Sequence, residues 1–353
     1  MRELTYRGSH FERGLQRGLR LKDTLAVPGM RALPAEFVEG CRAAAAEFYP
    51  SVIEEFEGLL RGGDFDRQAM TAYYFARLES RLGGCTMFAV QPAFRRSGRG
   101  PIVGRNYDWA VEDLRWCRLE RCFPADGLRR IGYTHHWAGC PDVLNERGLY
   151  LAIASLPAEP VLAPGVQWSI LVDMISECCS SVPEAVSLCA RVRHLRSMSY
   201  LLADASGELA VVEATPSGVS ARSPENGFVL ATNRAHGGRV LADFGSGRAG
   251  ARPGRPIGPA RAERRQEALR RAERRYKHAA EMLEHELPRV SEEGIRRVLT
   301  DHEAPICTGD HGHADGAPWA TIWSGICAPA EGRLKIAPGL PCRHPYHSFR
   351  FDA

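Results

Sequence analysis

Apolar residues recur at helical spacing along the first part of the chain. Between residues 35 and 61 they fall on one face of a helix, and Pro50 interrupts the pattern. Proline is tolerated in the first turn of a helix and glycine favours its end, so two helices are expected here, the second running from Pro50 to Gly62-Gly63. A third helix is expected from about Asp66 to Leu82, where Gly83-Gly84 end it.

The pattern changes from helical spacing to alternation at Cys85. Residues 85–89 are apolar and alternate, residues 91–101 supply turn formers, and residues 102–109 alternate again, which predicts a β-hairpin. Helices come first and hairpins dominate the middle of the chain, a distribution typical of an α+β fold. The later predicted elements are a strand at 149–154, helices at 167–178 and 183–192, a hairpin at 199–216 and a strand at 227–233.

Residues 83–86, Gly-Gly-Cys-Thr, are the first candidate for chemistry. A thiol is the most nucleophilic common side chain, and it needs only a base or a positive charge nearby to react at neutral pH. Glycine reaches positive φ without a Cβ penalty, so Gly83-Gly84 can hold the Gly84 carbonyl within reach of the Cys85 sulfur. That geometry suggests self-cleavage before Cys85, although Gly-Gly-Cys also fits a turn into a strand whose cysteine only packs.

The predicted hairpin returns a cation and a carboxylate toward this cysteine. Its second strand contains Gly104-Arg105-Asn106-Tyr107-Asp108-Trp109. A Cys-Thr pair followed by such a segment resembles the cysteine branch of the N-terminal nucleophile hydrolases, the superfamily of penicillin acyltransferase, penicillin V acylase and bile salt (choloylglycine) hydrolase.

The N-terminal segment adds to this resemblance. Ser9 precedes a helical pattern and Glu12 follows three residues later, so a capped helix is expected, with Gly14 and Gly18 allowing close helix packing. The same run resembles the opening of the penicillin acyltransferase branch, which also has a helical N-terminal portion. Residues 1–84 are therefore interpreted as a helical segment that becomes the small subunit, and 85–353 as the catalytic portion of one composite domain.

The resemblance implies a fold, a processing step and a catalytic group. The fold is a four-layer αββα sandwich, and the chain is expected to cleave itself between Gly84 and Cys85. The freed α-amino group of Cys85 then serves as the base for its own thiol, so no histidine is required. Arg105 is expected to lower the pKa of that thiol, and Asp108 to hold the new amine by a charge-assisted hydrogen bond.

The resemblance also implies roles for two asparagines and one arginine. Asn145, in the turn before the strand at 149–154, and Asn233, at the end of the strand at 227–233, are expected to donate to the oxyanion. From the residues alone, an asparagine in such a turn serves the backbone. Arg261 or Arg264 is expected near the site, although glutamates at helical spacing through this basic run predict an exposed helix.

Composition changes this picture little. With 353 residues, 44% hydrophobic and 25% charged, the chain can bury a core, and its net charge of +4 does not indicate nucleic acid. No apolar run reaches about 18 residues and no leader pattern opens the chain, so a cytoplasmic location is expected.

Eleven cysteines at irregular spacing indicate reduced thiols. The run from Cys307 to Asp315 suggests zinc at first, but its spacing matches no structural zinc pattern, so neither a metal nor another cofactor is expected.

The expected activity is acyl transfer through an acyl-enzyme on Cys85, from a small-molecule amide or acyl-CoA to an amine or water. The alternative is a hydrolase of N-acyl amino acids, lactones or peptides without CoA, which the sequence does not separate because both pass through the same acyl-enzyme. A non-catalytic binding protein on the same fold is disfavoured, because Cys85, Arg105 and Asp108 are all present. The self-cleaved fragments are expected to stay associated, without nucleic acid or membrane partners.

Overall fold

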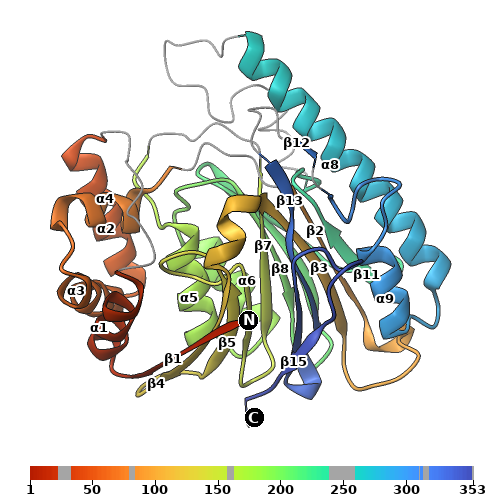
Figure 1. The fold of residues 1–353 in the computed structure, drawn as a ribbon, viewed down its shortest axis with the longest axis horizontal. Helices are drawn as coiled ribbons and strands as arrows, with labels where there is room; N and C mark the ends of the chain where they lie inside the picture. Colours follow the sequence, from red (N-terminus) through yellow and green to blue (C-terminus); the bar gives the residue numbers. More distant parts are fainter. Residues whose placement is uncertain are drawn as a thin grey trace.

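Two β-sheets packed face to face form the centre of the molecule (Figure 1). The computed structural model describes residues 1–22, 33–78, 84–156, 163–237, 259–309, 311–312 and 318–351. The larger sheet has eight strands in the order β1-β4-β5-β6-β7-β8-β9-β10, and the smaller has seven, in the order β11-β2-β3-β13-β14-β15 with β12 beside β13.

The strands of the larger sheet are β1 (Arg2–Gly8), β4 (Arg118–Pro124), β5 (Arg130–Thr134), β6 (Asp142–Asn145), β7 (Tyr150–Ser155), β8 (Met198–Ala203), β9 (Leu209–Thr215) and β10 (Gly218–Arg222). Those of the smaller sheet are β2 (Gly84–Val90), β3 (Ile102–Ala110), β11 (Phe228–Ala231), β12 (His311–Gly312), β13 (Pro318–Ala328), β14 (Arg333–Pro338) and β15 (His347–Phe349).

Alternation along the strands divides the interior into layers. Met87 and Val103 from the smaller sheet pack with Leu144 from the larger, and these residues belong to the core between the sheets. The neighbouring side chains point the other way, because successive residues of a strand face opposite sides. Phe88 thus joins the core outside the smaller sheet, and Val143 joins the core outside the larger one.

Helices cover both outer faces. The larger sheet is covered by α1 (His10–Leu21), α2 (Ala35–Phe48), α3 (Ser51–Gly63), α4 (Arg67–Ala76), α5 (Trp168–Cys178) and α6 (Val182–Arg191). The smaller sheet is covered by α8 (Pro259–Glu286) and α9 (Glu292–Leu299), while η1 (Pro92–Phe94), η2 (Val111–Trp116) and η3 (Pro329–Glu331) are short 3-10 turns. Helix, sheet, sheet and helix follow one another from left to right in Figure 1, which confirms the four-layer αββα sandwich. Among the described residues, no helix combines the length and apolar character needed to cross a bilayer.

Most predicted elements are present, with two corrections at the N-terminal end. Helix α1 begins after Ser9, which forms the expected capping box with Glu12. The third predicted helix is shorter than expected, because α4 ends at Ala76 and residues 79–83 lie outside the described ones. The segment before Cys85 is also not purely helical: β1 pairs in parallel with β4 over its whole length.

Candidate active site

Cys85 lies near the start of a central strand, with its side chain toward the core between the sheets. Strand β2 is flanked by β11 and β3, and Cys85 stands opposite Tyr107 in the β2–β3 hairpin. Its side chain is buried, at 2% exposure. Arg105 is opposite Met87, one diagonal position away on the same face of the hairpin. The predicted hairpin therefore brings the thiol and the guanidinium together.

Arg105 is held on several sides at once. Its Nη2 lies 3.8 Å from the Cys85 sulfur and 2.7 Å from the carbonyl oxygen of Ile153, to which it donates. Its Nη1 donates to Asp142 at 2.6 Å and to the Pro141 carbonyl at 2.5 Å. Burial raises the pKa of the Cys85 thiol, and the Arg105 charge acts in the opposite direction. Burial outweighs the Arg105 charge in the uncleaved chain, so the lowered pKa expected for the Cys85 thiol stays a prediction for the cleaved protein.

Asn233 fixes the backbone nitrogen of Cys85. This nitrogen donates to Asn233 Oδ1 at 2.6 Å, and Arg275 Nη2 donates to the same oxygen at 2.9 Å. Because both neighbours are donors, the carbonyl side of the amide faces Cys85. The amide nitrogen of Asn233 donates instead to the Ser155 carbonyl at 2.9 Å. The structure therefore brings Asn233 beside Cys85 as expected, but through its oxygen, and the oxyanion role stays a prediction.

Asp108 lies against Gly84 across the hairpin. A Cβ added to Gly84 would stand 2.8 Å from Asp108 Oδ2, so the carboxylate occupies the space that a side chain would need. Gly84 belongs to strand β2 and does not have the positive φ considered for the Gly83-Gly84 pair, while Gly83 lies outside the described residues. Thr321 donates to Asp108 Oδ1 at 2.7 Å and Thr308 donates to Oδ2 at 2.9 Å. Burial nevertheless raises the pKa of Asp108 to about 6.

Asn145 is not part of this cluster, and its predicted oxyanion role is wrong. Its amide nitrogen donates to the carbonyls of Ser176 at 3.1 Å and Cys179 at 2.8 Å, at the end of α5. Its oxygen accepts from the backbone nitrogens of Arg147 at 3.1 Å and Leu149 at 3.0 Å. Helix α5 covers the outer face of the larger sheet, so the amide points away from the core that contains Cys85. The turn role suggested by the residues alone is the one observed.

The arginine near the site is Arg275. Arg264 is exposed, and the Arg261 side chain lies outside the described residues. Arg275 is buried, at 6% exposure, and reaches Asn233 from α8. Arg275 was not predicted as a site residue because the run of arginines and glutamates at 261–278 is typical of an exposed helix. A signal was present in the stripe that α8 buries at helical spacing: Ala272, Arg275, Ala279 and Leu283.

Two histidines that were not predicted as site residues contact Tyr107, the residue opposite Cys85 in the hairpin. The Tyr107 hydroxyl lies 3.2 Å from Nε2 of both His135 and His136. Tyr107 also stacks on Trp323, with ring centroids 3.9 Å apart. Burial lowers the pKa of His136 well below its ordinary value, so this imidazole is neutral. Both imidazole rings therefore contact Tyr107, the residue opposite Cys85 in the β2–β3 hairpin.

Two face-to-face sheets between helical layers are the fold of the N-terminal nucleophile hydrolases. A family model described as "Acyl-coenzyme A:6-aminopenicillanic acid acyl-transferase" matches residues 95–342, more than half of the chain, and the chain belongs to this family. It is therefore an enzyme of an acyltransferase family. The matched residues begin after Cys85, so the match does not include the predicted nucleophile.

Several solved structures are similar to this chain over most of its length. A conjugated bile acid hydrolase variant from Clostridium perfringens is 12% identical, with 76% of this chain and 97% of that chain covered and a TM-score of 0.49. An N-acylethanolamine-hydrolyzing acid amidase ortholog from Caenorhabditis elegans is 13% identical, with 70% and 93% covered and a TM-score of 0.44. Penicillin V acylase from Agrobacterium tumefaciens is 15% identical, with 78% and 81% covered and a TM-score of 0.40. No curated protein sequence matches.

Proposed function

We propose that the chain cleaves itself between Gly84 and Cys85 and then transfers acyl groups through a thioester on Cys85. One observation carries this proposal: both reacting atoms of Cys85 are held by buried polar groups. Its nitrogen lies 2.6 Å from Asn233 Oδ1 and its sulfur 3.8 Å from Arg105 Nη2. A cysteine that only packs in a core needs neither contact.

Processing begins with attack of the Cys85 sulfur on the Gly84 carbonyl carbon. The C–N bond breaks as the C–S bond forms, the thiol proton passes to the Cys85 nitrogen, and the N-terminal segment becomes a thioester. Water then hydrolyses this thioester, which leaves a carboxylate on Gly84 and a free thiol and amine on Cys85. Asp108 supports this step through its position against Gly84, because its carboxylate can accept a hydrogen bond from the new ammonium group.

Turnover repeats the same bond changes on an external substrate. The Cys85 amine takes the thiol proton, and the sulfur attacks the carbonyl of an amide or acyl thioester. The leaving amine or thiol receives the proton, and the acyl group remains on sulfur until an amine or water takes it. Asn233 and Arg275 position the amine, while Arg105 stabilises the thiolate.

Denaturing mass spectrometry of freshly purified protein tests the processing step. We expect an 84-residue and a 269-residue fragment in place of the 353-residue chain. Cys85→Ala should remain in one piece, because the nucleophile is lost. Cys117→Ala is the matched control: it removes another buried thiol of the same core and should cleave normally. An intact wild-type chain in a folded sample contradicts the proposal.

A second experiment decides the acyl acceptor. Incubation with a panel of acyl-CoAs and N-acyl amides, followed by rapid quenching and peptide mass spectrometry, should detect an acyl group on Cys85. Partition of that intermediate between water and added amines then separates a hydrolase from an acyltransferase. Acylation that persists in Cys85→Ala would place the nucleophile elsewhere.

A further inference from the structure

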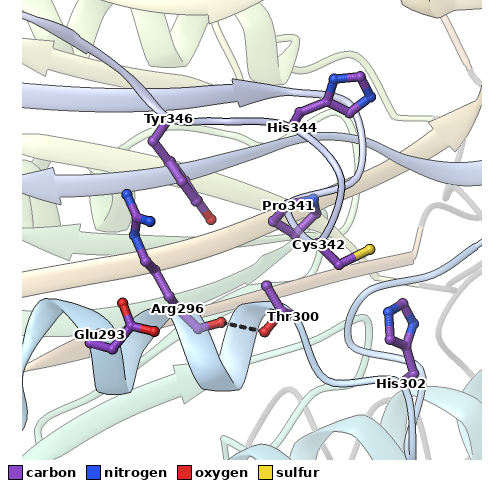
Figure 2. Close-up of a pocket in the computed structure, with 8 residues that line it drawn as sticks. All are labelled: Glu293, Arg296, Thr300, His302, Pro341, Cys342, His344 and Tyr346. Atoms are coloured by element: carbon purple, nitrogen blue, oxygen red, sulfur yellow. Dashed lines mark hydrogen bonds between the residues drawn. The ribbon is translucent and has the colours of Figure 1, made fainter.

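A second group of reactive side chains lies beside a surface pocket between α9 and the segment that joins β14 to β15. Figure 2 shows His302, Thr300 and Cys342 at this pocket, with the Cys342 sulfur and the His302 ring at the same end. Cys307 is buried behind them, and its sulfur lies 3.7 Å from that of Cys342. The mechanism proposed for Cys85 uses none of these groups.

We propose that His302, Cys307 and Cys342 bind a zinc ion. Their ligand atoms all lie within 4.8 Å of one another. Two thiolates at about 2.3 Å from one zinc ion, at a tetrahedral angle, are about 3.8 Å apart, and the two sulfurs have this separation. A disulfide would need them at about 2.0 Å. The sulfurs are thus placed to share an ion.

The ring of His302 is oriented by a backbone carbonyl. Its Nδ1 lies 2.9 Å from the Cys307 carbonyl oxygen. A carbonyl only accepts, so Nδ1 carries the proton and Nε2 carries the lone pair. Histidines that bind metals are commonly held in this way by a backbone carbonyl or carboxylate, which fixes both tautomer and ring.

The donor set selects the metal. Two thiolates and one imidazole suit zinc, whereas magnesium and calcium prefer oxygen ligands. His302 and Cys342 are exposed, so an ion can enter from the solvent side and keep a water molecule as its fourth ligand. The ion would link the segment after α9 to the segment before β15, which are distant in the sequence.

This position connects the proposed ion to the active site. Thr308 follows Cys307 directly, and its hydroxyl donates to Asp108 Oδ2 at 2.9 Å. The Thr308 nitrogen donates to Thr321 Oγ1 at 3.0 Å, and Thr321 is the other donor to Asp108. An ion that anchors Cys307 would therefore keep both threonines in place around Asp108.

The test uses the full-length protein and zinc alone. After incubation with Zn²⁺ and gel filtration, we expect about one zinc per chain by elemental mass spectrometry. Cys342→Ser and His302→Gln should each weaken binding by at least about 10-fold, because each removes a ligand. Both residues are exposed, so the variants should fold, and circular dichroism verifies it. With Co²⁺, the wild type should show a thiolate charge-transfer band that Cys342→Ser reduces.

Two controls separate this site from other thiols. Cys178→Ser removes an exposed cysteine elsewhere, and Cys85→Ala removes the catalytic thiol, and both should retain the ion. Less than about 0.1 zinc per wild-type chain would overturn the proposal. So would equal binding by Cys342→Ser and wild type, or a Cys307–Cys342 disulfide found by non-reducing peptide mapping. None of these outcomes depends on whether the chain cleaves at Gly84.

Discussion

At the scale of single residues, Asp108 is a buried carboxylate whose ionised form is destabilised by its surroundings. It is 1% exposed, and two threonine hydroxyls donate to it. Burial raises its pKa to about 6, although the charges of Arg275 and Arg105 act in the other direction. Because this pKa lies below 7, the carboxylate is ionised at neutral pH, and the folded chain contains a buried negative charge. That charge reduces the stability of the folded state relative to a protonated Asp108.

The Asp108 pKa predicts a stability difference with a definite sign. Because the folded pKa lies above the unfolded value of 3.8, the folded state holds this proton more tightly between about pH 4 and 6. Its contribution to the free energy of unfolding therefore falls as pH rises through that window, by up to about 3 kcal/mol. The measurement is made in Cys85→Ala, which cannot cleave itself. Adding Asp108→Asn to this chain should remove the decrease in the free energy of unfolding between about pH 4 and 6, and the double variant should be more stable than Cys85→Ala at pH 7.

Urea unfolding at several pH values between 4 and 8 measures this difference. Asp126→Asn is the matched control, since Asp126 is exposed and should leave the pH dependence unchanged. Parallel curves for Asp108→Asn and its parent would show that Asp108 ionises in the folded chain as it does in the unfolded one.

The predictable residues of the site were those that one hairpin brings together. Cys85, Arg105 and Asp108 lie within one antiparallel pair, so their proximity follows from local pairing. Asn145 was misassigned because a motif places a residue at the end of a strand without saying which face its side chain takes. A one-residue difference decides that face, since successive residues of a strand alternate. Arg275 was missed because the many charged residues of α8 hide the short stripe of small and apolar residues that packs on the smaller sheet.

At the scale of elements, α1 and α3 pack with their backbones in contact. A Cβ on Gly14 would lie 1.9 Å from the Glu55 carbonyl oxygen, and one on Gly58 would lie 2.0 Å from that of Phe11. Gly18 and Gly62 show the same crowding one turn further along. The glycines at the N-terminus are therefore explained by close helix packing, as their spacing predicted.

Gly14→Ala should destabilise the chain. The new methyl group meets backbone that cannot move independently, and overpacking of this kind costs about 1–3 kcal/mol. Gly294→Ala is the matched control in α9, because its nearest neighbour is the end of the flexible Glu286 side chain, and alanine gains about 1 kcal/mol of helix propensity over glycine. Thermal unfolding compares the two, and a Gly14→Ala midpoint equal to that of Gly294→Ala would contradict the close packing.

Strand β1 was not predicted from the sequence. Leu4 and Tyr6 are its buried residues, and two inward positions in seven residues give a weak pattern. Its partner β4 lies more than a hundred residues away, so its place in the sheet depends on a long-range contact. The sequence predicted the β2–β3 hairpin well because that pairing is local.

At the scale of the whole molecule, the described residues before Cys85 join the rest through strand β1, through apolar side chains of the core outside the larger sheet, and through a buried network of charges. The cross-segment contacts include Arg13 with Glu177 at 3.0 Å and Arg17 with Glu120 at 3.2 Å. Breaking a buried pair on one side costs about 3–5 kcal/mol, because the remaining charge is left without its partner. These contacts, with β1 in the larger sheet, support our proposal that the fragments stay together after cleavage. The network comprises His10, Arg13, Arg17, Glu55, Arg118, Glu120, Arg130, Asp173 and Glu177.

His10 makes the strength of this attachment depend on pH. Burial lowers the His10 pKa, but hydrogen bonds to Glu177 and Glu55 outweigh burial and raise it to about 9. A histidine whose folded pKa exceeds its unfolded value of 6.5 stabilises the folded state fully below that value. That stabilisation is lost as pH rises through about 9, a window above the one in which Asp108 titrates.

The uncleavable Cys85→Ala chain should therefore lose stability between about pH 6.5 and 9, and His10→Gln should lose less over the same range. At pH 6, where the imidazolium bridges Glu177 and Glu55, His10→Gln should be the weaker chain. His347→Gln, at an exposed position, is the matched control and should follow its parent. Urea unfolding at pH 6 and pH 9.5 provides the comparison. If His10→Gln and the control lose the same free energy between these two pH values, the attachment of residues 1–84 does not depend on the charge of His10.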